Sequence, residues 1–189
     1  MLLHTEYEVR VLNIKKEKII KKLEELHAEF QWDLIQKRYV YDFIPNIESK
    51  WIRLRTNGKK TTLTIKNLVS SEIDGTQELE IEVDNFERCN LILKELGYVP
   101  KGYQENRRRQ YLLNGVEVDI DSWPLIPDYL EIEGPSEEAV YNALESLGFK
   151  REDATSRDVE GIFLDYGHNL NDIYNLKLEE ERKWQYMRI

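Results

Sequence analysis

The chain is poor in the residues that build covalent frameworks and soft-metal sites. Its 189 residues include one cysteine, Cys89, and three scattered histidines. One cysteine excludes an internal disulfide framework and a cysteine-based zinc site, and three scattered histidines argue against a histidine-rich metal site. A metal site in this chain would therefore rely on carboxylate oxygens, which suit Mg²⁺ or Mn²⁺.

Long apolar runs and an excess of basic residues are also missing. No stretch approaches the ~20 apolar residues that a helix needs to span a bilayer, and the polar N-terminus does not resemble a secretory leader. The formal net charge of −9 argues against nucleic acid as a partner. With 41% hydrophobic and 33% charged residues, the composition is that of an ordinary globular protein. We therefore expect a cytoplasmic protein without a membrane or nucleic-acid partner.

Cap and turn residues divide the sequence into expected elements. An N-cap residue and an apolar stripe that ends at Phe30 predict a helix at 13–30, and an N-cap residue and a C-terminal glycine predict helices at 84–97 and 136–148. Asn-Gly and Asp-Gly pairs mark turns between strands. Residues 1–150 contain all of these elements and are expected to form one domain, with residues 151–189 as a polar helical tail packed on it or extending it. The expected strands are 6–10, 37–43, 50–55, 61–66, 77–83, 104–113, 116–121 and 129–133.

Nearly every expected strand alternates aliphatic and ionic residues, as Glu6-Tyr7-Glu8-Val9-Arg10 does. In a single strand, a charged face that meets water is the more common explanation. However, the charges are sorted by sign, with arginines in 50–55 and acids in 77–83 and 116–121, whereas wet faces usually mix signs. The sorting favours an antiparallel sheet that closes into a barrel, with helices on the aliphatic face and the ionic face inside.

The hairpin around Asn114-Gly115 gives the orientation of the neighbouring arginines. A two-residue turn pairs Leu113 with Val116 and Arg108 with Asp121. Directly paired residues share a face, so Arg108 is expected inside the barrel, while the residues on either side of it, 107 and 109, point outward.

The expected interior contains twice as many acids as bases. Excess carboxylates in a confined space take up protons or bind hard cations, and clustered guanidinium groups suit phosphate. A tunnel that contains both is what a metal–triphosphate complex requires. The acids are Glu6, Glu8, Glu78, Glu80, Glu82, Glu117, Asp119, Asp121, Glu131 and Glu133, and the bases are Arg10, Arg53, Arg55, Lys66 and Arg108.

These motifs, in this order, resemble the CYTH family of class IV adenylyl cyclases and thiamine triphosphatases, also called triphosphate tunnel metalloenzymes. Glu6-x-Glu8-x-Arg10 stands where the family has ExExK, and Arg53-x-Arg55 matches its LRxR strand. The segment DIDSWPLIPDYLEIEG matches a later acidic motif. The resemblance covers roughly residues 1–150 and implies an α+β fold, an eight-stranded antiparallel β-barrel tunnel with helices packed outside.

The resemblance also implies roles for the ionic residues, with Mg²⁺ or Mn²⁺ as cofactor. Arg10 and Tyr41 are the catalytic candidates. The phosphate-binding candidates are Arg10, Arg53, Arg55, Lys66 and Arg108. The metal-ligand candidates are Glu6, Glu8, Glu80, Glu82, Asp119, Asp121, Glu131 and Glu133.

Several positions depart from the family pattern. Arg10 replaces the signature lysine, and because arginine is essentially never deprotonated, it can position groups but not act as a base. Asn106 replaces the lysine of a Lys-x-Arg pair, which leaves that strand one charge short. Tyr39 or Tyr41 would supply a hydroxyl group near the attacking water, although packing in the barrel wall explains both equally well.

Three functions are open on this evidence. The first is metal-dependent hydrolysis of a phosphoanhydride bond in inorganic triphosphate, thiamine triphosphate or ATP. The second is a class IV adenylyl cyclase that converts ATP to cyclic AMP and pyrophosphate. The third is a non-catalytic protein that binds nucleotide or polyphosphate. A monomer or a homodimer is expected in each case.

Overall fold

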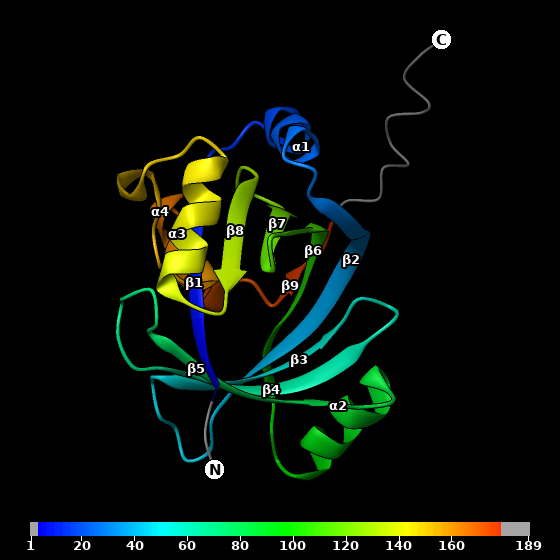
Figure 1. Ribbon diagram of the computed structural model, residues 1–189. Helices are drawn as coiled ribbons and strands as arrows, with labels where there is room; N and C mark the ends of the chain where they lie inside the picture. The colour runs from blue at the N-terminus through cyan, green and yellow to red at the C-terminus, as the bar shows by residue number, and fades with distance from the viewer. Residues whose placement is uncertain (1–3, 179–189) are drawn as a thin grey trace.

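Eight antiparallel strands close into a barrel in the computed structural model, which describes residues 4–178 (Figure 1). The strands follow the order β2-β3-β4-β5-β1-β8-β7-β6, and β6 pairs with β2 to close the ring. The predicted eight-stranded barrel is therefore confirmed. The strands are β1 (His4–Val11), β2 (Glu29–Asp42), β3 (Lys50–Thr56), β4 (Thr61–Leu68), β5 (Thr76–Glu82), β6 (Pro100–Leu113), β7 (Val116–Ser122) and β8 (Tyr129–Gly134).

The helices cover the aliphatic face of the barrel from outside. Helices α1 (Lys16–Glu25) and α3 (Glu137–Ser146) pack against β1, β7 and β8, where Val118 and Ile132 are fully buried. Helix α2 (Phe86–Glu95) packs against β3 toward the opposite end (Figure 1). With the aliphatic side chains under helices, the alternate side chains of each strand point into the barrel. No helix within residues 4–178 is long and apolar enough to cross a membrane.

The β6–β7 hairpin has the register that its Asn-Gly turn predicts. Leu113 pairs with Val116 and Arg108 with Asp121. Arg108 is buried inside, whereas Arg107 and Arg109 lie outside and both bind Asp33. The predicted orientations of the three arginines are confirmed.

The first helix is shorter than predicted. It ends at Glu25, and His27 adopts a left-handed conformation with φ 55°, which turns the chain into β2. Phe30 therefore lies in a strand and is 56% exposed. The apolar spacing suggested a longer helix, but the 14-residue strand β2 gains backbone pairing along β6 instead. The predicted N-caps of the first two helices are also wrong, because Lys15 precedes α1 and the Asn85 side chain caps α2 by accepting a hydrogen bond from the Arg88 N–H at 2.9 Å.

The last described segment packs on the barrel and is only partly helical. It contains α4 (Val159–Asp165), two 3₁₀ turns (Arg151–Asp153 and Leu170–Asp172) and the short strand β9 (Asn175–Leu176), which pairs in parallel with β6. Its apolar residues pack with Trp123 and Tyr129. The expectation of a polar helical tail over 151–189 is thus wrong where the chain forms β9, and residues 179–189 of that expected tail lie outside the described residues.

Candidate functional site

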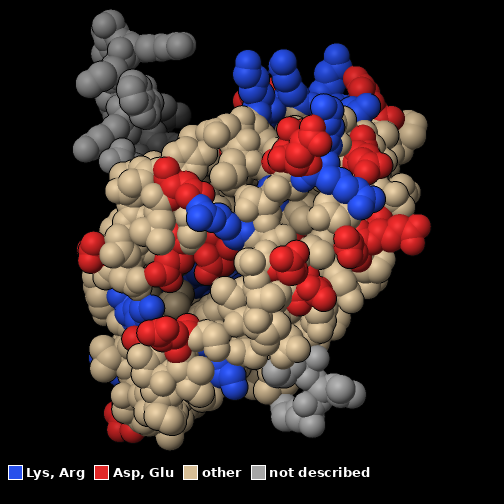
Figure 2. Space-filling model, turned by 90° about the vertical axis from the view of Figure 1, so that its left-hand side faces the viewer, with Lys and Arg blue, Asp and Glu red and all other residues tan. Residues whose placement is uncertain are grey.

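The ionic faces of the strands meet inside the barrel, as predicted. Two cavities, of about 340 and 370 Å³, run through this interior and share part of their lining. The surface is hollowed on the face shown in Figure 2, where acidic and basic side chains gather around the opening. The side chains that line both cavities are Glu8, Arg10, Arg38, Arg53, Lys66 and Val159.

Arg10 ties β1 to β8 and to the C-terminal segment. Its Nε donates to Glu131 at 2.8 Å, its Nη2 to Glu8 at 2.8 Å, and its Nη1 to the backbone carbonyl of Arg157 at 2.8 Å. Burial alone would lower the pKa of Arg10, but the carboxylates of Glu131 and Glu8 hold it well above its usual value. Arg10 therefore stays charged and binds carboxylates, whereas the sequence made it a catalytic and phosphate-binding candidate.

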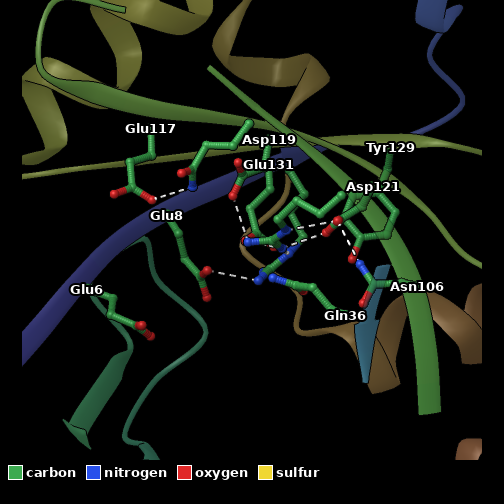
Figure 3. A network of polar contacts seen from close by, with 12 residues as sticks. Glu6, Glu8, Gln36, Asn106, Glu117, Asp119, Asp121, Tyr129 and Glu131 are labelled. Carbon is green, nitrogen blue, oxygen red and sulfur yellow. Dashed lines mark hydrogen bonds and ion pairs between the residues drawn. The ribbon is translucent and has the colours of Figure 1, made fainter. Parts of the chain in front are cut away.

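Arg108 forms a second ion-pair centre with Asp119, Asp121 and Glu131, acidic residues that lie close together in Figure 3. Its guanidinium donates to Asp119 at 2.6 Å, to both oxygens of Asp121 at 2.9 and 2.6 Å, and to Glu131 at 2.8 Å. Asp121 is 0% exposed and also accepts from the Asn106 side-chain amide at 2.9 Å. Burial would raise the pKa of Glu131, but Arg10 and Arg108 bring it far below its usual value. Glu131 is therefore an ionised bridge between the two arginines.

Three carboxylates converge where a cation would fit. Oxygens of Glu8, Glu131 and Glu133 lie within 4.8 Å of one another. Burial, followed by repulsion from Glu6, Glu8 and Glu131, raises the pKa of Glu133 to about 8. This concentration of negative charge fits a hard divalent cation, which would relieve the repulsion and displace the proton.

The wall formed by β2, β3 and β4 carries the opposite charge. Arg53 lies 3.8 and 3.6 Å from Glu78 and Glu80, at the long end of ion-pair distances, and Lys66 binds Glu6 at 2.8 Å. Arg55 forms no ion pair with any residue of the described range 4–178. Burial and the neighbouring charges of Arg53 and Arg108 lower the pKa of Arg55 to about 10. This wall therefore has room for a negatively charged ligand.

Two candidates from the sequence are not brought to this site. Tyr41 is 0% exposed but packs outside the barrel wall under α2, where its hydroxyl donates to Asn90 at 2.9 Å. Glu82 lies exposed at the end of β5. Glu80, two residues earlier, points inward and accepts from Thr64 at 2.7 Å, while Glu117 sits at the opening of one cavity.

Strands β2 and β6 contribute further polar residues to the interior, of which the sequence pointed only to Asn106, as the replacement of a lysine. Gln36 and Arg38 come from β2, and Gln104 and Asn106 from β6, and all four are buried. The two strands pair so that Gln36 lies opposite Asn106 and Arg38 opposite Gln104. A period of two, counted back from Arg108, would have found the β6 residues.

The model of the CYTH domain family matches residues 4–158, and the chain belongs to this family. No curated protein matches the chain.

Solved structures share the fold. The PH1012 protein from Pyrococcus horikoshii is 27% identical, with a TM-score of 0.71 over 81% of this chain and 96% of that one. A candidate adenylate cyclase from Vibrio parahaemolyticus is 12% identical, with a TM-score of 0.73 over 85% and 98% of the two chains. A candidate adenylyl cyclase from Hippeastrum, whose structure is described as revealing a dominant triphosphatase activity, is 18% identical, with a TM-score of 0.53 over 88% and 96%.

Proposed function

We propose that the protein binds a triphosphate group and a divalent cation inside the barrel and hydrolyses a phosphoanhydride bond of an inorganic or organic triphosphate. The observation that carries this proposal is the separation of charge within one interior. Glu8, Glu131 and Glu133 form a carboxylate cluster, and Arg53 and Arg55 form an incompletely neutralised cationic wall opposite. In a magnesium or manganese triphosphate, the cation would bind the carboxylate cluster and the anionic phosphate chain would bind the cationic wall.

The ion pairs indicate which residues would bind the metal, which would position its ligands and which would bind the phosphate chain. Mg²⁺ or Mn²⁺ at the carboxylate cluster would neutralise charge that develops on the phosphoryl oxygens. Arg10 and Arg108 hold Glu131 in place from both sides, so the cluster is preorganised. Arg53 and Arg55 face the anion directly, and Lys66 reaches it by exchanging its contact with Glu6. Arginine suits this task because its planar fork binds phosphate oxygens in pairs.

Two alternatives use the same site. Cyclisation of ATP is favoured by the structural likeness to the candidate adenylate cyclase from Vibrio parahaemolyticus. Binding without catalysis is favoured by Arg10, because its three directed contacts and raised pKa make it unfit to take a proton from water.

A product analysis separates the three functions. Purified protein is incubated with Mg²⁺ or Mn²⁺ and offered inorganic triphosphate, thiamine triphosphate or ATP. Release of orthophosphate supports hydrolysis, and cyclic AMP with pyrophosphate supports the cyclase. The Arg53→Gln variant should lose the activity, and Arg109→Gln, which removes a charge from the outer face, should retain it. Saturable binding with no product would support the third function, binding without catalysis. If none of the three triphosphates bound, all three proposed functions would be refuted.

A further inference from the structure

Arg38 is a buried cation of the interior that was not among the phosphate-binding candidates from the sequence. Its side chain comes from β2 and the residue is 6% exposed. Its Nη2 donates to Gln36 Oε1 at 3.0 Å and also contacts Asn106 Oδ1. Both acceptors are neutral, so these bonds orient the guanidinium without cancelling its charge.

The charge of Arg38 is only partly balanced in the part of the chain that the structure describes, because the Asp121 carboxylate acts on it from beyond Asn106, which contacts both side chains. No Asp or Glu of residues 4–178 forms an ion pair with Arg38, in contrast to the carboxylates around Arg10 and Arg108. Its Nε is buried and has no hydrogen-bond acceptor. Burial, with the nearby charges of Arg55 and Arg53, lowers the pKa of Arg38 to about 9. A buried, unpaired donor of this kind costs free energy unless a ligand satisfies it.

The packing around Arg38 holds it where a ligand would pass. Its guanidinium carbon lies 4.6 Å from the centre of the Trp123 ring, and the Trp123 indole N–H donates to the Tyr129 hydroxyl at 2.9 Å. Arg38 also pairs in register with Arg55 and lines both cavities at the point where they meet. The stacked and hydrogen-bonded side chain is therefore preorganised beside Arg55 rather than free to turn away.

We propose that Arg38 is a phosphate-binding residue, which supplies from β2 the positive charge that Asn106 leaves missing on β6. Arg38, Arg53 and Arg55 together form the surface that receives the phosphate chain, while Arg10 and Arg108 are committed to carboxylates. This inference rests on the proposed binding of a triphosphate, and it identifies which face of the interior does the binding. The unpaired Nε of Arg38 is the donor that awaits a phosphoryl oxygen.

The test compares the binding of inorganic triphosphate, at fixed Mg²⁺, to the parent chain and to Arg38→Gln by isothermal titration calorimetry. Loss of a charge-assisted contact should weaken binding by about 10- to 100-fold. The matched control is Lys37→Gln, which removes the same charge from the adjacent, outward-facing residue and should bind within about twofold of the parent. Arg38→Lys, which keeps the charge but not the planar fork, should fall between the parent and Arg38→Gln.

The melting temperature without ligand separates a binding role from a structural one. Arg38→Gln should melt at or above the temperature of the parent, because an unpaired buried charge has been removed. Parent-like affinity in Arg38→Gln would overturn the role of Arg38 and leave the proposed function intact, whereas a parent that does not bind triphosphate would overturn both. A large drop in melting temperature would assign Arg38 to the fold and overturn the inference.

Discussion

Arg108 and Asp121 face each other across the β6–β7 hairpin in a two-point ion pair, with Arg108 Nε and Nη2 donating to the two oxygens of Asp121 at 2.9 and 2.6 Å. The two residues are also partners in register. Both oxygens of Asp121 accept hydrogen bonds from Arg108, and one of them also accepts a hydrogen bond from the Asn106 side-chain amide. The sequence suggested Asp121 as a metal ligand, and its contacts favour a structural role instead.

Removal of this carboxylate should therefore be costly for the fold. We expect Asp121→Ala to reduce the free energy of unfolding by about 3 kcal/mol, because an arginine loses its best buried partner. Urea unfolding measures the change. Asp33→Ala, which breaks the ion pairs with Arg107 and Arg109 on the outer face, serves as the control and should cost about 1 kcal/mol or less. An Asp121→Ala protein of parent stability that no longer binds Mn²⁺ would restore Asp121 to the ligand set.

The carboxylate cluster should decide metal affinity. Replacing Glu8 or Glu133 by glutamine removes a charged oxygen from a site of few ligands, so the affinity for Mn²⁺ should fall at least about tenfold. Electron paramagnetic resonance of free Mn²⁺ during a titration measures this. Glu82→Gln removes a carboxylate from the exposed end of β5 and should leave the affinity unchanged. If all three variants bound Mn²⁺ like the parent, the cation would have to sit elsewhere.

Replacing Arg10 by lysine should destabilise the fold even though the positive charge is kept. In Arg10→Lys an ammonium group replaces a planar fork that now reaches Glu8, Glu131 and the Arg157 carbonyl. Losing one or two charge-assisted contacts should reduce the free energy of unfolding by about 2 kcal/mol. Arg109→Lys on the outer face is the comparison. Equal stability of the parent and Arg10→Lys would show that the three contacts do not support the fold.

Glu133 gives the metal-free protein a specific pH dependence. Its pKa is about 8 in the folded chain against an ordinary 4.5, so between these values the folded state binds a proton that the unfolded state has released. The stability that this group contributes is complete below about pH 4.5 and is lost as the pH rises through about 8. In a chelating buffer, the melting temperature of the parent should therefore fall more steeply from pH 5 to 8.5 than that of Glu133→Gln. Parallel curves would refute the raised pKa.

Alternation was sufficient to predict the barrel and most of its lining. A period of two places every residue of a strand on one of two faces, and the Asn-Gly turn fixed the register that turned Arg108 inward. These are local properties, so the sequence carries them. The three carboxylates of the cluster were all among the metal-ligand candidates, because Glu131 and Glu133 lie two residues apart on one strand and Glu8 lies across the β1–β8 pair.

The failures came from contacts that depend on the packing of distant segments. Phe30 fitted the apolar stripe of a helix, and only the long pairing of β2 with β6 makes it part of a strand. Tyr41 was a candidate for a hydroxyl group near the attacking water, but its side chain lies on the face of β2 that α2 covers, outside the barrel interior. Arg38 was overlooked because its contacts with Asn106 and the Trp123 ring depend on the packing of distant segments, which no local pattern reveals.

The most direct test of a triphosphate site inside the barrel is anomalous diffraction from a crystal grown with Mn²⁺ and inorganic triphosphate. The expected map has a manganese peak between Glu8, Glu131 and Glu133, and a phosphate chain that runs from it to Arg38, Arg53 and Arg55. Manganese bound only on the outer surface, with no phosphate density in either cavity, would contradict the proposed site.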